Sequence, residues 1–225
     1  MPARSIVVDY DGTVTAEDYL DVVSMEFGDV GSLAEIEAGL DGGAGGVNDV
    51  IRREYQGVKA RLDEVVEWLR EHVRMRDGFA DFVAQAERDG WRVLLLSSGF
   101  VELIAPILER EGLDGLEVHA NAVDARPSGW VARFVDETRC GRCGEACKRR
   151  RLLQLVPSGT IVYLGDGRSD RCAAEEADHI FAVAGGGLDD YLRRRGVPHI
   201  RFRDFAEPAA WLRAYRSGAP SSSPH

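Results

Sequence analysis

Three short apolar segments, each followed by reactive side chains, most constrain the fold of this 225-residue chain. They are residues 5–8, followed by Asp9, residues 92–96, followed by Ser97, and residues 160–164, followed by Gly165 and Asp166. A continuous apolar run of this length is typical of a strand buried on both faces of a parallel sheet. Because ligands bind beyond the carboxyl ends of such strands, we expect the three ends to meet at one site.

Helical patterns separate these strands. Apolar residues share one face within residues 79–86, and others share a face within residues 103–108, where Pro106 should kink the helix or confine it to its first turns. A third apolar stripe lies within residues 188–192, and weaker strand patterns occur at residues 180–183 and 199–202. The alternation predicts an α/β fold with a Rossmann-like, mostly parallel sheet sandwiched by helices.

Two segments interrupt the alternation. Residues 15–76 carry helical patterns around a Gly-rich loop at residues 39–46, and we interpret them as a small helical cap inserted into a core formed by residues 1–14 and 77–216. Residues 117–135 contain two alternating stretches around Pro127-Ser128-Gly129, which predicts a β-hairpin. Residues 217–225 contain almost nothing to bury, and we expect a disordered tail.

Composition and charge exclude several classes of partner. The formal net charge of −10 argues against nucleic acid, whose phosphates would be repelled. No apolar run approaches the roughly 20 residues that a membrane span needs. The first residues begin a strand pattern almost at once and do not resemble a signal peptide, so we expect a cytoplasmic protein. The sequence does not indicate the oligomeric state.

Acidic residues are paired after the first and third strands. Asp9 and Asp11 are two residues apart on an extended chain and therefore face the same side, and Asp166 and Asp170 follow the third strand. Two carboxylates about 4 Å apart repel by roughly 4 kcal/mol at an effective dielectric constant near 20. A hard divalent cation removes this repulsion, and oxygen ligands favour Mg²⁺. Lys148 is a candidate second cation for a phosphate group.

These motifs occur in the order that marks the haloacid dehalogenase superfamily. The matching segments are Asp9-Tyr10-Asp11-Gly12-Thr13, Ser97, Lys148 and residues 165–170. The helical insertion after the first motif resembles the cap of subclass IB, which includes the phosphoserine phosphatases. Residues 75–79 and 105–108 and the Cys-rich segment before Lys148 resemble the phosphatases acting on 2-hydroxy-3-keto-5-methylthiopentenyl phosphate, on phosphocholine and on phosphoethanolamine. The resemblance covers about residues 5–205.

The resemblance implies a magnesium-dependent phosphatase that acts on a small phosphorylated metabolite. It implies that Asp9 is the nucleophile and a metal ligand, and that Asp11 is the general acid and base, with its carbonyl on the metal. It also implies that Ser97 and Lys148 hold phosphoryl oxygens. It further implies a metal carboxylate at Asp166, while Asp170 would hold either the metal's water shell or the lysine.

Several residues near these motifs have two interpretations. Ser98 stands where related phosphatases have glycine, so it would either narrow the pocket or add a hydrogen bond to phosphate. Thr15 with Asp18 is predicted to cap a helix, but Asp18 and Glu17 could also contact the substrate from the helical cap. Arg76 is either a solvated arginine or a hinge residue that contacts the phosphate.

The four cysteines leave three alternatives open. Cys140, Cys143 and Cys147 form a C-x-x-C-x-x-x-C series directly before Lys148. Cys172 lies two residues after Asp170. They would form a structural zinc site, four reduced thiols in a tight loop, or a regulatory disulfide.

Two further functions are compatible with the motifs. The superfamily motifs do not determine whether water or another alcohol finally accepts the phosphoryl group, so a phosphotransferase is one alternative. A non-catalytic phosphate-binding or receiver-type signalling protein is the other, although a receiver domain is about half this length and carries its aspartate on a later strand.

Overall fold

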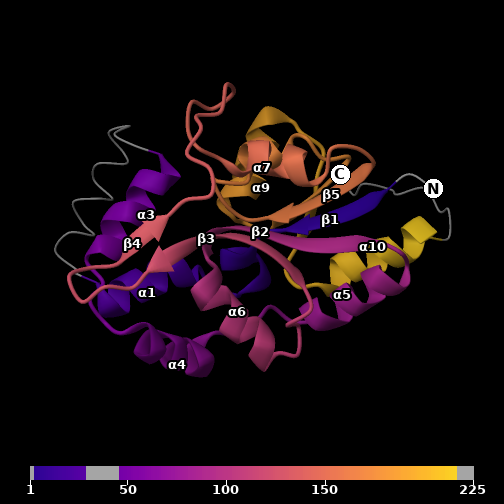
Figure 1. Ribbon diagram of the computed structural model, residues 1–225. Coiled ribbons are helices and arrows are strands. Elements are labelled where there is room, and N and C mark those ends of the chain that lie inside the picture. Colours follow the sequence, from indigo (N-terminus) through magenta and orange to yellow (C-terminus); the bar gives the residue numbers. More distant parts are fainter. Residues whose placement is uncertain (1–2, 29–45, 217–225) are drawn as a thin grey trace.

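One seven-stranded sheet forms the centre of the computed structural model, which describes residues 3–28 and 46–216 (Figure 1). The strand order is β4-β3-β2-β1-β5-β6-β7, and each neighbouring pair is parallel except β3 and β4. The predicted mostly parallel sheet is therefore confirmed. The strands are β1 (Arg4–Val8), β2 (Arg92–Phe100), β3 (Glu117–Asp124), β4 (Val131–Arg133), β5 (Thr160–Gly165), β6 (His179–Val183) and β7 (Ile200–Phe202).

Helices cover both faces of this sheet. Helices α5, α6 and α10 lie on one face, and α7 and α9 lie on the other (Figure 1). No helix among the described residues is long and apolar enough to cross a membrane. The helices that follow the first part of the chain, from residue 79 onward, are α5 (Phe79–Arg88), α6 (Val101–Arg110), α7 (Lys148–Leu155), α8 (Arg171–Ala174), α9 (Gly187–Arg195) and α10 (Ala206–Arg216).

The first strand shows why both faces must be covered. Ile6 and Val8 point into the cluster formed with α5 and α10, whereas Val7 points into the cluster that contains Leu152 of α7. All three strand side chains are fully buried. Burying such a side chain contributes roughly 1.5–3 kcal/mol, so each face of the sheet binds its own helical layer.

Three described helices lie between the first strand and α5. A tight turn, η1 (Tyr10–Val14), leads into α1 (Tyr19–Phe27), α3 (Val47–Gln56) and α4 (Leu62–His72). We call these three the inserted helices. The chain enters and leaves them side by side, because Ala16 N donates to Arg74 O at 3.0 Å and Arg76 N donates to Val14 O at 2.7 Å.

Two expectations about loops lie outside the described residues. The Gly-rich loop predicted at residues 39–46 is outside them except for Gly46, which precedes α3. The tail at residues 217–225 is outside them entirely. The division into core and cap at residues 14–15 and 76–77 stays a prediction.

The remaining helix and hairpin expectations had different outcomes. Strands β3 and β4 are antiparallel, which confirms the hairpin predicted at residues 117–135. Pro106 lies inside α6, which continues to Arg110, so the expectation that the helix is confined to its first turns is wrong. Leu103, Ile104, Ile107 and Leu108 on this helix are all buried, so tertiary packing holds the turn that proline weakens.

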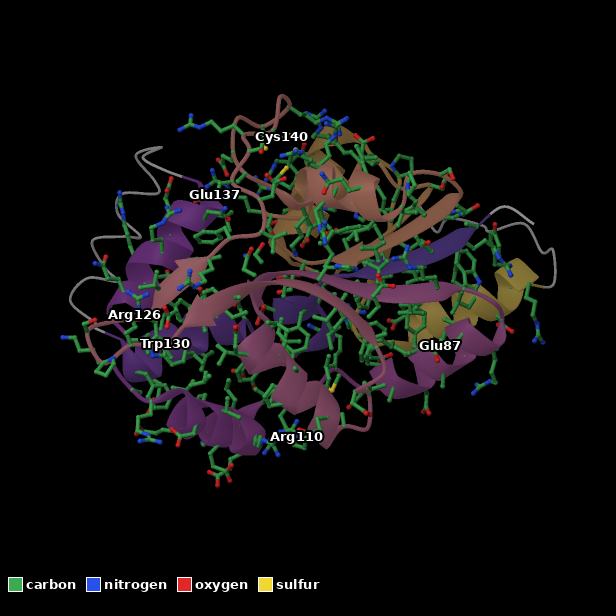
Figure 2. The ribbon with its side chains drawn as sticks, viewed as in Figure 1. Glu87, Arg110, Arg126, Trp130, Glu137 and Cys140 are labelled. Atoms are coloured by element: carbon green, nitrogen blue, oxygen red, sulfur yellow. The ribbon has the colours of Figure 1, made fainter. Side chains whose placement is uncertain are left out.

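Trp130 joins the hairpin to the inserted helices (Figure 2). Its backbone N–H donates to the carbonyls of Tyr55 and Val58, both at 3.1 Å. Its indole Nε1 donates to Ala60 O at 2.9 Å, and the side chain is 1% exposed. The residue therefore connects β4 to the chain that follows α3 by both packing and hydrogen bonds.

Replacing Trp130 tests this connection. We expect Trp130→Ala to lower the free energy of unfolding by about 3–5 kcal/mol, because it leaves a cavity between hairpin and helices. Trp130→Phe keeps an aromatic ring and loses the indole hydrogen bond, so we expect a loss of about 1–2 kcal/mol. Urea denaturation measures both. An alanine variant as stable as wild type would show that the hairpin does not hold the inserted helices.

Candidate active site

The carboxyl ends of three adjacent strands bring the predicted residues together. Strands β2, β1 and β5 are neighbours, so Asp9, Ser97 and Asp166 lie at the same edge of the sheet. Thr13 Oγ1 lies 3.3 Å from both Asp9 Oδ2 and Asp166 Oδ1. The acidic residues that follow the first and the third predicted strands thus meet, and Thr13 bridges them. Sequence reasoning assigned Thr13 no role, although the residue belongs to the first motif.

Lys148 is buried between two carboxylates. It is the first residue of α7, and its Nζ donates to Asp9 Oδ1 and, at 2.7 Å, to Asp170 Oδ1. Its side chain is 5% exposed. Burial opposes the lysine's charge, but Asp170 and Asp9 outweigh it and raise the pKa of the ammonium. Lys148 is therefore a permanent cation at this site.

Asp170 has no oxygen lone pair left for a metal. Its Oδ1 accepts from Lys148 Nζ and from Tyr163 OH, both at 2.7 Å, and its Oδ2 accepts from the backbone N–H groups of Asp166 and Gly167. A carboxylate offers about four acceptor positions, and four donors occupy them. Of the two roles expected for Asp170, the contacts favour holding the lysine. Sequence reasoning missed Tyr163; the signal was a hydroxyl in an otherwise aliphatic buried strand.

The second strand orients Asp11. Ser97 Oγ donates to Asp11 Oδ2 at 3.3 Å and accepts from Gly99 N at 2.8 Å. A Cβ at position 99 would lie 2.8 Å from Asp11 Oδ2, so only glycine leaves room there. The neighbouring Ser98 lines the cleft described below, and its carbonyl accepts from Asn121.

The turn after Asp9 is held by Arg76, which lies in the segment that leads from the inserted helices back to the sheet. Gly12 has a φ of +74°, and a Cβ there would lie 2.5 Å from Asp166 Oδ2. Arg76 donates to Gly12 O at 2.8 Å, to Thr13 O at 3.0 Å and to Arg203 O at 2.9 Å. The structure therefore places Arg76 on backbone carbonyls of the turn, and not in the cleft where a substrate contact was expected.

The acids raise one another's pKa values. Burial and the charge of Asp170 raise the pKa of Asp9 well above its usual range. Burial and Asp18 raise the pKa of Asp11 to about 8, and burial and Asp170 raise that of Asp166 to about 6. The folded site thus disfavours full ionisation of its carboxyl groups, and a further cation would relieve that cost.

Oxygen atoms suited to a metal ion are close together. Carboxylate oxygens of Asp9, Asp166 and Asp170 lie within 4.8 Å of one another. Because the Asp170 oxygens are saturated, Asp9 and Asp166 offer the free lone pairs. A set of hard oxygen ligands beside crowded acids fits a magnesium ion.

A cleft between the inserted helices and the sheet opens onto Asp9 and Asp11. Asp18 lines it and also begins α1, where its Oδ1 accepts from Leu20 N at 3.1 Å and from Asp21 N at 3.3 Å. The expected cap is thus confirmed for Asp18 but not for Thr15, whose Oγ1 accepts from Gly12 N at 3.1 Å in the preceding turn. The backbone carbonyl of Glu17 holds the preceding turn, because it accepts from Gly12 N at 3.0 Å. Other described residues of the inserted helices along the cleft are Leu20, Asp21, Val47, Val50, Ile51 and Glu54.

The four cysteine side chains also converge. Their Sγ atoms lie within 4.8 Å of one another, beside the start of α7 and α8. This cluster is separate from the group of carboxylates.

Comparison with known proteins identifies the family. The model of the haloacid dehalogenase-like hydrolases matches residues 6–175, which include all three strand ends of the site. This chain belongs to that family. The resemblance inferred from the motifs is confirmed, and a receiver-type signalling domain is excluded.

Similar proteins of this hydrolase family include named phosphatases. Pdp3-interacting factor 1 from Schizosaccharomyces pombe is 30% identical, over 88% of this chain and 90% of the relative. Polyol phosphate phosphatase PYP1 from Saccharomyces cerevisiae is 28% identical, over 95% and 94%. The 2-hydroxy-3-keto-5-methylthiopentenyl-1-phosphate phosphatase from Geobacillus kaustophilus is 29% identical, over 88% and 90%. The enzyme is a phosphoric monoester hydrolase that acts on small phosphate esters.

Solved structures confirm the fold of the hydrolase. A phosphoserine phosphatase with an analogue of the phospho-aspartyl intermediate superimposes with a TM-score of 0.70 at 19% identity, covering 94% of this chain and 99% of that one. A substrate-bound phosphoserine phosphatase gives a TM-score of 0.69 at 18% identity, covering 94% and 99%. This likeness shows the architecture alone.

Arg76→Ala separates an anchor of the turn from a substrate contact. We expect kcat to fall about tenfold with KM nearly unchanged, because the carbonyls of Gly12 and Thr13 lose their donor. The free energy of unfolding should fall by about 1–2 kcal/mol. Steady-state kinetics and urea denaturation measure these effects. Arg74→Ala is the control, since the Arg74 side chain donates to the carbonyls of Glu71 and Val73 at the end of α4. A rise in KM alone would mean that Arg76 binds substrate.

Proposed function

We propose that this enzyme is a magnesium-dependent phosphatase that hydrolyses a small-metabolite phosphate monoester through an aspartyl phosphate on Asp9. The observation that carries the proposal is the buried placement of Asp9. It lies at the end of β1 between Lys148 and Asp166, while Asp11 opens onto the same cleft. A nucleophile, a cation and a proton donor therefore share one site.

In the first half-reaction, a carboxylate oxygen of Asp9 attacks the phosphorus atom. A bond forms between Asp9 and phosphorus, and the bond from phosphorus to the alcohol oxygen breaks. Asp11, whose pKa is raised by burial and by Asp18, gives its proton to the leaving oxygen. Lys148 and Ser97 hold the phosphoryl oxygens while negative charge builds on them.

In the second half-reaction, water attacks the same phosphorus atom. Asp11, now ionised, takes the proton from this water, and the bond between phosphorus and Asp9 breaks. Inorganic phosphate leaves, and both aspartates return to their starting states. One carboxyl group therefore serves first as acid and then as base.

Magnesium would be held by the carboxylates of Asp9 and Asp166 and by the carbonyl of Asp11. A bound Mg²⁺ neutralises charge on the phosphoryl oxygens and balances the crowded acids. Asp170 fixes Lys148, and Thr13 fixes the distance between Asp9 and Asp166. Ser98, at the rim of the cleft, would be a further phosphate-binding group.

Residues 15–76 would form the cap, and residues 1–14 with 77–216 the core. The segments at residues 14–16 and 74–76, which join the cap to the core, are paired by hydrogen bonds. Trp130 of the hairpin packs against the same helices, so a movement of the cap would also involve the hairpin. Closure would exclude water during formation of the phospho-enzyme and bring Asp18 toward the alcohol part of the substrate. A site closed in this way suits a metabolite-sized ester.

Asp9→Asn tests the nucleophile. We expect kcat to fall by at least about 10⁴-fold, because the amide oxygen does not form the phospho-enzyme. Phosphate release from an aryl phosphate measures it, and Asp114→Asn, a change on the exposed surface, should leave the rate unchanged. Chelator-treated wild-type enzyme should be inactive and should recover with Mg²⁺. Turnover by Asp9→Asn near the wild-type rate would exclude the proposed mechanism.

The charge of the cleft bears on the alcohol part of the substrate. Its described cap side carries Asp18, Asp21 and Glu54. The described cations along it are Lys148, bound to Asp9 and Asp170, and Arg168, bound to Glu145. Residues 29–45 contain no lysine, arginine or histidine. A leaving group with a second negative charge would meet Asp18, whose own negative charge is already disfavoured by burial.

We therefore favour a neutral or cationic alcohol, as in polyol, methylthiopentenyl, choline or ethanolamine esters, over the carboxylate-bearing phosphoserine. The names of two relatives, a polyol phosphate phosphatase and the methylthiopentenyl phosphatase, agree with this choice.

A substrate panel tests the preference. We expect kcat/KM for the best neutral or cationic ester to exceed that for phosphoserine by about 100-fold, equivalent to about 2.7 kcal/mol. Asp18→Asn, which keeps a side-chain oxygen to cap α1, should lower kcat/KM for cationic esters more than for neutral ones. Asp63→Asn, an exposed change on α4 away from the cleft, is the matched control. Phosphoserine as the best substrate would refute the assignment of the alcohol class but not of the mechanism.

A further inference from the structure

The four cysteines of the chain form a cluster that the phosphatase reaction does not use. Their Sγ atoms lie within 4.8 Å of one another and come from two segments. Three belong to residues 134–147, the connection between β4 and α7, and the fourth, Cys172, lies in α8 and is 5% exposed. We propose that Cys140, Cys143, Cys147 and Cys172 bind a structural zinc ion.

The spacing of the sulfur atoms suits tetrahedral ligation. Zinc–sulfur bonds of about 2.3 Å at tetrahedral angles place the sulfur atoms about 3.8 Å apart. All four Sγ atoms, three from the loop and one from α8, lie within 4.8 Å of one another, which leaves room for one such ion among them. A disulfide would pair two sulfur atoms at about 2.05 Å and would leave the other two without a role. Convergence of all four on one point therefore favours a metal, and four thiolates favour zinc.

The backbone is arranged to support thiolates. The N–H group of Arg142 donates to Cys140 Sγ at 3.4 Å. This tight turn closes with a hydrogen bond from Gly144 N to Cys140 O at 2.8 Å, and Gly144 has a φ of +76°. Cys147 is the N-cap of α7, and the N-terminal end of a helix favours negative charge. These donors would offset the net charge of −2 on a zinc ion with four thiolates.

The loop is held by polar contacts and not by a hydrophobic core. Residues 134–147 contain no helix or strand, and none of them is fully buried. Arg142 pairs with Glu175 and Glu176 beyond α8, and Arg168 pairs with Glu145. Partly exposed ion pairs contribute little against the roughly 1–2 kcal/mol of backbone entropy that each ordered residue loses. A metal bound by three side chains of the loop and by one from α8 would add to this stabilisation.

The position of the cluster gives the metal a consequence for catalysis. Cys147 directly precedes Lys148, and Cys172 lies two residues after Asp170. Lys148 and Asp170 are joined at 2.7 Å. Zinc would therefore fasten α7 to α8 beside the lysine that holds the phosphoryl group, without touching the substrate itself.

Elemental analysis of the untagged protein, purified without chelator, tests the proposal. We expect about one equivalent of zinc per chain, and a Co²⁺-substituted protein with the charge-transfer absorption of thiolate ligation. Cys143→Ser, at an exposed position, should retain a small fraction of the zinc, and Cys172→Ser should behave likewise. Arg139→Ser introduces the same residue into the same loop at a position that is not a ligand, and it should keep the full equivalent.

Three outcomes would overturn the zinc site. They are less than about 0.2 equivalents of zinc with four freely titrating thiols, iron in place of zinc, or a disulfide that forms without metal. Cys172 is buried, so Cys172→Ser could fail to fold and lose zinc for that reason. Cys143 is exposed, and a circular dichroism spectrum of Cys143→Ser like that of wild type would show that its loss of zinc is not due to unfolding. Since metal content is measured without turnover, a failed zinc site leaves the phosphatase proposal intact, and an inactive Asp9→Asn says nothing about zinc.

Discussion

The buried contact of Lys148 with Asp9 and Asp170 is the constraint on which the site depends. Removing such ions from water costs several kcal/mol each, and only close pairing with further donors offsets that cost. Here Tyr163 and two backbone N–H groups complete the shell of Asp170. The contact joins the end of β1 to the starts of α7 and α8, so the two carboxylates and the lysine are positioned by the same packing that forms one face of the fold.

Sequence was sufficient to predict the parts that follow from local pattern. The runs at residues 5–8 and 160–164 contain three and four consecutive apolar side chains, a length that suits a strand buried on both faces, and the structure pairs them directly. Asp9 and Asp166 then meet because adjacent parallel strands end at the same edge. Their convergence follows from topology, and it did not require knowing any side-chain contact.

The rest could not be predicted because it depends on contacts between distant residues. Arg76 binds carbonyls at positions 12, 13 and 203, and no local pattern indicates which carbonyls lie within its reach. Asp170 could be assigned to the lysine only when its four donors were known. Pro106 weakens α6 locally, but burial of the apolar side chains around it outweighs a cost of about 3 kcal/mol. In each case tertiary packing decided between alternatives that were equal in sequence.

The ion pair and the sulfur cluster share the same two backbone segments. Cys147 and Lys148 are adjacent at the start of α7, while Asp170 and Cys172 are two residues apart at the start of α8. A displacement that moves the two segments apart would lengthen the contact between Lys148 and Asp170, and it would also separate Cys147 from Cys172. A lysine that must meet a phosphoryl oxygen within tenths of an ångström cannot depend on an irregular loop. A second connection between α7 and α8, on the side away from the substrate, adds to the ion pairs of Arg142 and Glu145 that already hold this loop.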